Sequence, residues 1–205
     1  MWTIAKKEIS IYFSSNVGYL SIGSFLTVNS LFLWFFDTDF NILNSGFADL
    51  TNFFLLAPWL LIFLIPAICM RSFSAEKQAG TLELILTKPI SIWGVILGKY
   101  IGCIVLNIFA LLPTLLYLVV LEKLRLDYTS LNYVTLIAGY FGLICISSTF
   151  ISFGILCSVL SKNEVSAYIS SCLLCFVNYY MWKEIAELND NERFFSFIDS
   201  LGIFQ

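Results

Sequence analysis

The charged residues of this chain lie in a few short segments, separated by long stretches without Asp, Glu, Lys or Arg. A helix needs roughly 20 predominantly apolar residues to cross about 30 Å of membrane hydrocarbon. Five uncharged stretches reach or approach that length: 9–36, 50–70, 100–121, 128–161 and 165–182. Only 12% of the residues are charged, whereas soluble domains carry about 25%. The sequence therefore predicts an all-α integral membrane protein with five transmembrane helices.

These stretches and their flanks form one predicted transmembrane domain, residues 1–205. The spans are expected near residues 17–36, 53–70, 90–120, 132–160 and 165–182. The segment 71–89, between the second and third spans, carries charges and turn-forming residues and is predicted to lie in the cytoplasm. The last residues, 183–205, mix charged with apolar side chains and are predicted to form an outward-facing amphipathic tail.

The first fifteen residues precede the first span and show helical periodicity. One face of a helix over 1–15 would hold Trp2, Ala5, Ile9, Tyr12 and Phe13, with Lys7, Ser10 and Ser14 opposite. This pattern favours an interfacial amphipathic helix at the membrane surface. The alternative is a continuation of the first span, because Ile4 and Ile11 fall outside the apolar face.

The distribution of Lys and Arg predicts the orientation, because basic residues are enriched in cytoplasmic loops. With the N-terminus inside, seven basic residues face the cytoplasm and four face outward. The seven are Lys6, Lys7, Arg71, Lys77, Lys88, Lys99 and Lys162. Lys99 lies two to three turns inside the third span, so its long side chain is expected to reach back to the cytoplasmic surface.

The sequence lacks residues that most membrane enzymes and proton-coupled carriers need. It contains no histidine, which excludes a Ser-His-Asp triad and a histidine-containing zinc site. No charged residue is predicted near mid-membrane, and Cys172 and Cys175 are interpreted as packing residues. The run Gly94–Lys99 is not a P-loop, because three residues separate its glycines where four are required. We therefore expect no catalytic, metal or cofactor site in this chain, and no binding of ATP by the chain itself.

The cytoplasmic segment 71–89 contains two helix-forming stretches separated by a stop signal. Residues 71–80 are predicted to extend the second span as a short helix that ends at Gly80 in the left-handed conformation. Thr81 is a suitable N-cap, and Pro89 a suitable stop, for a second helix of about two turns. Its apolar face consists of Leu82, Ile85 and Leu86. Because so short a helix is marginal alone in water, it is expected to dock either on the membrane and the spans or on a partner protein.

The third span contains three glycines at four-residue intervals, Gly94, Gly98 and Gly102. Small residues at this spacing let a second membrane helix approach closely. We therefore predict that this face packs against another helix, the alternative being a chance pattern.

The run from Glu76 to Pro89, followed by Leu97-Gly98-Lys99, resembles the loop between the second and third spans of ABC-2 type ABC transporter permeases. Residues 12–19, 57–73 and 112–114 are similar to the gliding-motility-associated members of that family. The resemblance implies a multi-pass permease of the bacterial inner membrane, paired with a second permease copy or a related membrane subunit. It also implies a separate ABC ATPase subunit, which binds the ATP and contacts a coupling helix in this chain. The expected contact residues are Glu76, Gly80, Thr81, Leu82, Glu83 and Leu86.

Members of this family have six spans, so a chain with five is expected to lack the last one. The resemblance leaves two roles open. The first is a permease subunit of an exporter that serves gliding motility. The alternative is a non-transporting membrane component that transmits ATPase-driven motion to a periplasmic or cell-surface partner.

Overall fold

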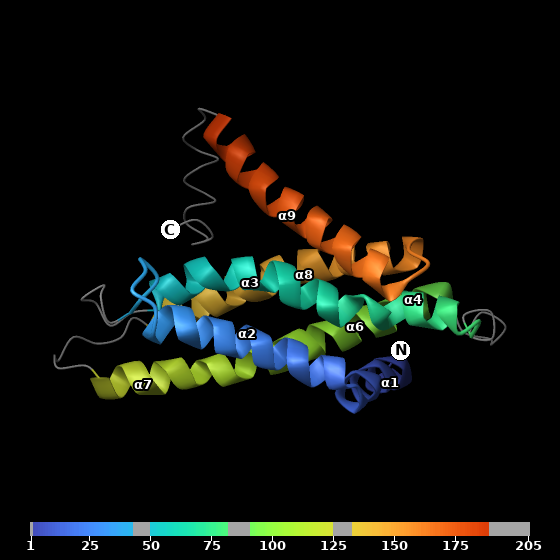
Figure 1. Ribbon diagram of the computed structural model, residues 1–205, viewed down its shortest axis with the longest axis horizontal. Helices are drawn as coiled ribbons and strands as arrows, with labels where there is room; N and C mark the ends of the chain where they lie inside the picture. Colours follow the sequence, from blue (N-terminus) through green and yellow to red (C-terminus); the bar gives the residue numbers. More distant parts are fainter. Residues whose placement is uncertain (1, 43–49, 82–90, 125–132, 189–205) are drawn as a thin grey trace.

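The computed structural model describes residues 2–42, 50–81, 91–124 and 133–188, and all regular elements in these ranges are helices. Figure 1 shows them as a bundle that is elongated along one axis. Their bounds are α1 Trp2–Ser14, α2 Asn16–Trp34, α3 Thr51–Cys69, α4 Arg71–Gln78, α6 Ile92–Leu111, η1 Leu112–Leu115, α7 Leu116–Leu124, α8 Tyr133–Leu160 and α9 Glu164–Leu188.

Four helical stretches of the described chain are long and apolar enough to cross a membrane. They are Asn16–Trp34, Thr51–Gln78, Ile92–Lys123 and Tyr133–Leu160. These stretches overlap the first four predicted spans and agree with the predicted all-α membrane bundle. The fifth predicted span lies within α9, whose serines, tyrosines and Asn178 make it less apolar than the other four.

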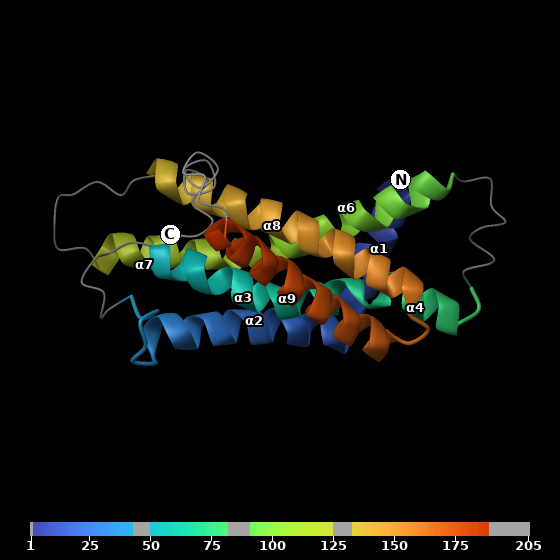
Figure 2. The same cartoon turned by 90° about the horizontal axis from the view of Figure 1, so that it is seen from above.

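Helix α3 occupies the centre of the bundle. It packs on α2, α6, α8 and α9, and side chains along its whole length are buried, among them Phe53, Leu61 and Ile65. The helices α2, α3 and α8 run along the long axis together with the α6–α7 pair (Figure 2). By contrast, α9 begins beside α8 and leans away from the bundle (Figure 1). We refer to the end that holds α4 as the α4 end; α7 lies at the opposite end.

One proline lies at an interruption of the third span, whereas two prolines in the second span leave helix α3 continuous. Helix α3 continues past Pro58 and Pro66 and ends at Cys69. Pro113 lies in the 3-10 turn η1, between α6 and α7. A proline inside a helix lacks the N–H donor and its ring clashes with the carbonyl four residues earlier. Residues 90–120, predicted as one helix, therefore include a 3-10 turn.

Helix α1 packs on the bundle through part of its predicted apolar face. Ala5 and Tyr12 are buried, and α6 and α2 are its neighbours, whereas Trp2 is 72% exposed. The corner between α1 and α2 is tight: the Ser15 hydroxyl accepts a hydrogen bond from the Gly18 N–H at 3.3 Å. A Cβ atom at Gly18 would overlap the Tyr12 carbonyl oxygen, so this corner requires glycine.

Candidate functional site: the helix junction at the α4 end

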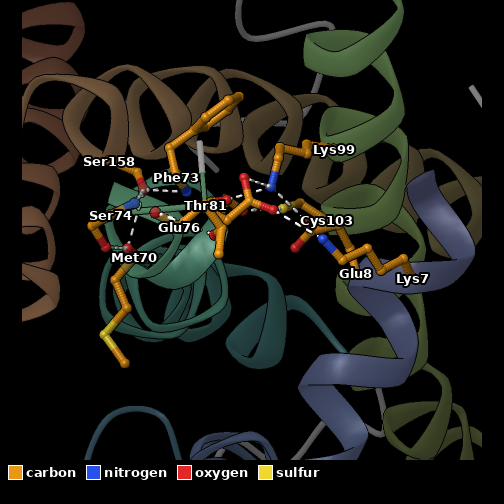
Figure 3. Close-up of polar contacts among 11 residues, drawn as sticks. Lys7, Glu8, Met70, Phe73, Ser74, Glu76, Thr81, Lys99, Cys103 and Ser158 are labelled. Atoms are coloured by element: carbon orange, nitrogen blue, oxygen red, sulfur yellow. Dashed lines mark hydrogen bonds and ion pairs between the residues drawn. The ribbon is translucent and has the colours of Figure 1, made fainter. Parts of the chain in front are cut away.

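A serine from α8 separates α3 from α4. The Ser158 hydroxyl accepts hydrogen bonds from the Phe73 N–H at 3.0 Å and the Ser74 N–H at 3.2 Å, and donates to the Met70 carbonyl at 3.0 Å (Figure 3). In an unbroken helix these N–H groups would donate to the carbonyls of Cys69 and Met70. A side chain inserted into this ladder is a known cause of helix breaks. The second span is therefore divided at Met70 into α3 and α4.

The far end of α4 closes with a glycine cap, as the sequence predicts. Gly80 has φ +65°, its N–H donates to the Lys77 carbonyl at 3.1 Å, and the Thr81 N–H donates to the Glu76 carbonyl at 3.0 Å. These two bonds form a Schellman motif, which favours glycine because L side chains rarely adopt this conformation. The predicted stop at Gly80 is confirmed. Gly80 and Thr81 are both exposed.

Three of the six predicted contact residues, Leu82, Glu83 and Leu86, lie outside the described residues. The predicted N-cap role of Thr81 for the following helix depends on the same segment. Within the described chain, the Thr81 hydroxyl donates to the Glu76 carbonyl at 3.3 Å, so it supports the end of α4.

Lys99 of α6 lies in a buried cluster of charges between three helices. Its ammonium group donates to Glu8 Oε1 of α1 at 2.5 Å and to the Ser72 carbonyl of α4, and it lies 3.1 Å from Glu76 Oε2 (Figure 3). It also lies 4.7 Å from the centre of the Phe73 ring. The residue is only 1% exposed. The expectation that the Lys99 side chain reaches back to the cytoplasmic surface is therefore wrong, because α1 and α4 enclose it.

Glu76, predicted to contact a partner, is a member of this intramolecular cluster. Its Oε1 atom accepts a hydrogen bond from Lys7 at 3.1 Å, and its side chain is only 12% exposed. The Oε2 atom lies within ion-pair distance of Lys99 but lacks hydrogen-bond geometry, so that contact is electrostatic. Glu8 is also mostly buried: burial raises the pKa of its carboxyl, and the Lys99 ammonium opposes this shift.

Close packing of α1 on α6 brings Glu8 to Lys99. Gly94, Gly98 and Gly102 are all buried in α6. A Cβ atom at Gly102 would lie 3.1 Å from Glu8 Cβ and 3.4 Å from the Ala5 carbonyl oxygen. Side-chain volume at Gly102 would therefore push α1 away from α6, and with it the Glu8 carboxylate from Lys99.

On its other side, α4 contacts the end of α8, the turn before α9 and the first residue of α9. Lys77 donates to the Val159 carbonyl, and Gln78 donates to the Asn163 side chain at 3.3 Å. Arg71 pairs with Glu164 at 3.2 Å, where the two side chains are 36% and 27% exposed. Helix α4 is therefore held on both sides. Buried charges hold it towards α1 and α6, and these more exposed contacts add to the Ser158 bonds on the side of α8 and α9.

Sequence reasoning missed Glu8 and Ser158 as members of this junction. A lysine deep in an apolar span needs a partner, because an unpaired buried charge is costly. That signal points to Lys99 but does not choose between the acidic residues of the chain. Ser158 gives no sequence signal, because serines are frequent in membrane helices. Among the described residues, no group of three or more metal-ligating side chains gathers in one place.

Most of this chain matches a known protein family. The model of the family described as ABC-2 family transporter protein matches residues 53–198. No curated protein matches this chain. The matched range includes nearly all of α3, together with α4, Lys99 and Ser158, whereas α1 and α2 precede it. Because the match covers well over half of a chain with several membrane-crossing helices, this protein belongs to the ABC-2 family of transporter membrane proteins.

Proposed function

We propose that this chain is a permease subunit of an ABC exporter and that a separate ATPase subunit drives it through residues 71–89. The family is that of the membrane component, so ATP binding and hydrolysis belong to the partner. In this proposal the α4 end and the N-terminus face the cytoplasm, where the ATPase lies. A second permease copy or a related membrane subunit completes the assembly in the bacterial inner membrane.

The position of α4 carries the proposal. The helix continues the second span beyond a break at Met70, ends in a capped and exposed turn at Gly80 and Thr81, and leads directly into residues 82–89. An ATPase bound to that segment would displace α4. Since α4 bonds to α8 through Ser158 and to α6 through Lys99, its displacement would act on the third and fourth spans.

Service in gliding motility or in linked cell-surface export is the finer part of the proposal. It rests on the similarity of residues 12–19, 57–73 and 112–114 to gliding-associated permeases. Deletion of the gene should abolish surface spreading of the source organism, and the full-length chain should restore it. Normal spreading of the deletion strain would remove this part of the proposal and leave the permease role untouched.

The docking site can be tested by co-purification with the candidate ABC ATPase subunit in detergent. Glu83→Lys and Leu86→Asp should each weaken association at least about tenfold, which corresponds to about 1.4 kcal/mol. The matched control is Glu122→Lys, which makes the same charge change at an exposed position on α7, at the opposite end of the bundle. Unchanged association of both test variants would refute docking on this segment.

A further inference from the structure

We propose that Lys99 is a positioning residue that joins α1, α4 and α6 into one moving unit, so that displacement of α4 is carried through α1 to the first span. This inference rests on the proposed function, because it assumes that a partner displaces α4. It adds a route to α2, which precedes the residues matched by the family model.

The contacts on the two sides of α4 differ in kind. Towards α1 and α6, one buried ammonium group contacts Glu8, the Ser72 carbonyl and Glu76. Separating these groups would leave charges buried without partners, which is strongly unfavourable. Towards α9, the Arg71–Glu164 pair is partly exposed, and exposed pairs contribute little because water and salt screen them. Apart from the buried Ser158 bonds to Phe73 and Ser74, which hold α4 to α8, a force on α4 would therefore separate it from the α8–α9 turn before it separated α4 from α1 and α6.

Helix α1 has a second set of buried contacts that continue this route. The Tyr12 hydroxyl forms a buried hydrogen bond with Ser21 of α2 at 2.5 Å. The corner that joins the two helices is tight, since Gly18 lies directly against Tyr12. A shift of α1 is thus transmitted to α2 both through the chain and through a side-chain contact. The sequence of contacts runs from α4 through Lys99 and Glu8 to α1, and from Tyr12 to α2.

The first test measures the energetic link in the isolated full-length chain in detergent. Lys99→Met, Glu8→Gln and the double variant are compared by thermal unfolding. Lys99→Met alone leaves the Glu8 carboxylate buried without its cation, and Glu8→Gln removes that charge. We therefore expect the double variant to lose less in Tm than the sum of the two single losses. Additive losses would overturn the proposed link.

The second test measures movement in the complex with the ATPase. Spin labels are placed at Ser10→Cys on α1 and Lys162→Cys in the α8–α9 turn, both exposed positions, after Cys145 and Cys172 are replaced by serine. The distance between labels is recorded without nucleotide and with ATP plus orthovanadate. We expect the distance to change in the otherwise native chain.

Variants at the cluster decide whether Lys99 carries this movement. The nucleotide-dependent change in distance should be lost in Lys99→Met and reduced in Glu8→Gln. Because Glu8→Gln preserves side-chain volume, it remains as the test variant if Lys99→Met does not fold. It should persist in Lys99→Arg, which keeps the positive charge. It should also persist in Lys7→Gln, which removes the half-exposed cation beside Glu76.

The outcomes separate this inference from the proposed function. Failure of the native chain to bind the ATPase would count against the proposed function. If the ATPase binds and hydrolyses ATP, an unchanged distance in the native chain would overturn the inference. A full distance change in both Glu8→Gln and Lys99→Met complexes would overturn it as well.

Discussion

Replacing Ser158 by alanine tests the break between α3 and α4 directly. In the native chain the Ser158 hydroxyl satisfies the N–H groups of Phe73 and Ser74, both buried. The Met70 carbonyl keeps a second donor, the Ser74 hydroxyl, so the substitution leaves two N–H groups without a partner. An unsatisfied buried group costs about 1–3 kcal/mol, which gives about 2–6 kcal/mol for the pair if the backbone stays in place.

The backbone has one way to reduce this loss. If α3 and α4 straighten into a continuous helix, both N–H groups regain carbonyl partners four residues earlier. The direction of α4 would then change, and with it the position of Glu76 relative to Lys99. We therefore expect Ser158→Ala to lower the free energy of unfolding by about 3 kcal/mol, in the lower half of the range for two unsatisfied groups. For a chain of this size that corresponds to a fall in Tm of roughly 6–12 °C.

Two measurements are needed, because the two responses exclude each other. Thermal unfolding in detergent reports the unsatisfied groups, and the distance between spin labels on α4 and α8 reports straightening. Ser152→Ala is the matched control: its hydroxyl is exposed on the same helix and donates only to the Ser148 carbonyl at 3.1 Å, so its effect should stay below about 0.5 kcal/mol. If Ser158→Ala matches this control in Tm and leaves the α4–α8 distance unchanged, the role given to Ser158 is refuted.

Three further predictions concern packing, the cap and pH. Gly102→Ala should destabilise the chain by about 1–3 kcal/mol, because the added Cβ meets α1. The control Gly23→Ala has open space around it and should be neutral or stabilising. Equal Tm values for the two variants would contradict this prediction. Gly80→Ala should cost about 1–2 kcal/mol through its left-handed φ, and a loss no larger than that of Gly23→Ala would count against the cap. Burial raises the pKa of the Glu8 carboxyl above 4.5, so the folded chain binds a proton at Glu8 more tightly than the unfolded chain does. The free energy of unfolding should therefore fall as the pH rises above 4.5. In unfolding measured across pH, Glu8→Gln should flatten the dependence of the free energy of unfolding on pH. An unchanged dependence would mean that another group causes it.

The sequence alone predicted those features that depend on neighbouring residues along the chain. The first four membrane-crossing helices follow from the lengths of uncharged apolar stretches, since span length is set by membrane thickness. The stop at Gly80 follows from the freedom of glycine to adopt positive φ. The ABC-2 assignment also came from a local run, residues 76–89, and the family match over 53–198 supports it.

The tertiary structure decided which residues along the chain become neighbours. Lys99 looked like a side chain that reaches the membrane surface, because the sequence could not show that α1 packs over it. The partner Glu8 is 91 residues away in sequence, and Ser158 lies 85 residues from Phe73. The pattern of apolar residues determines which segments form membrane helices, but many arrangements of those helices would bury a similar area. The junction at the α4 end is specific because it depends on short polar contacts, and their partners are set only once the helices have packed.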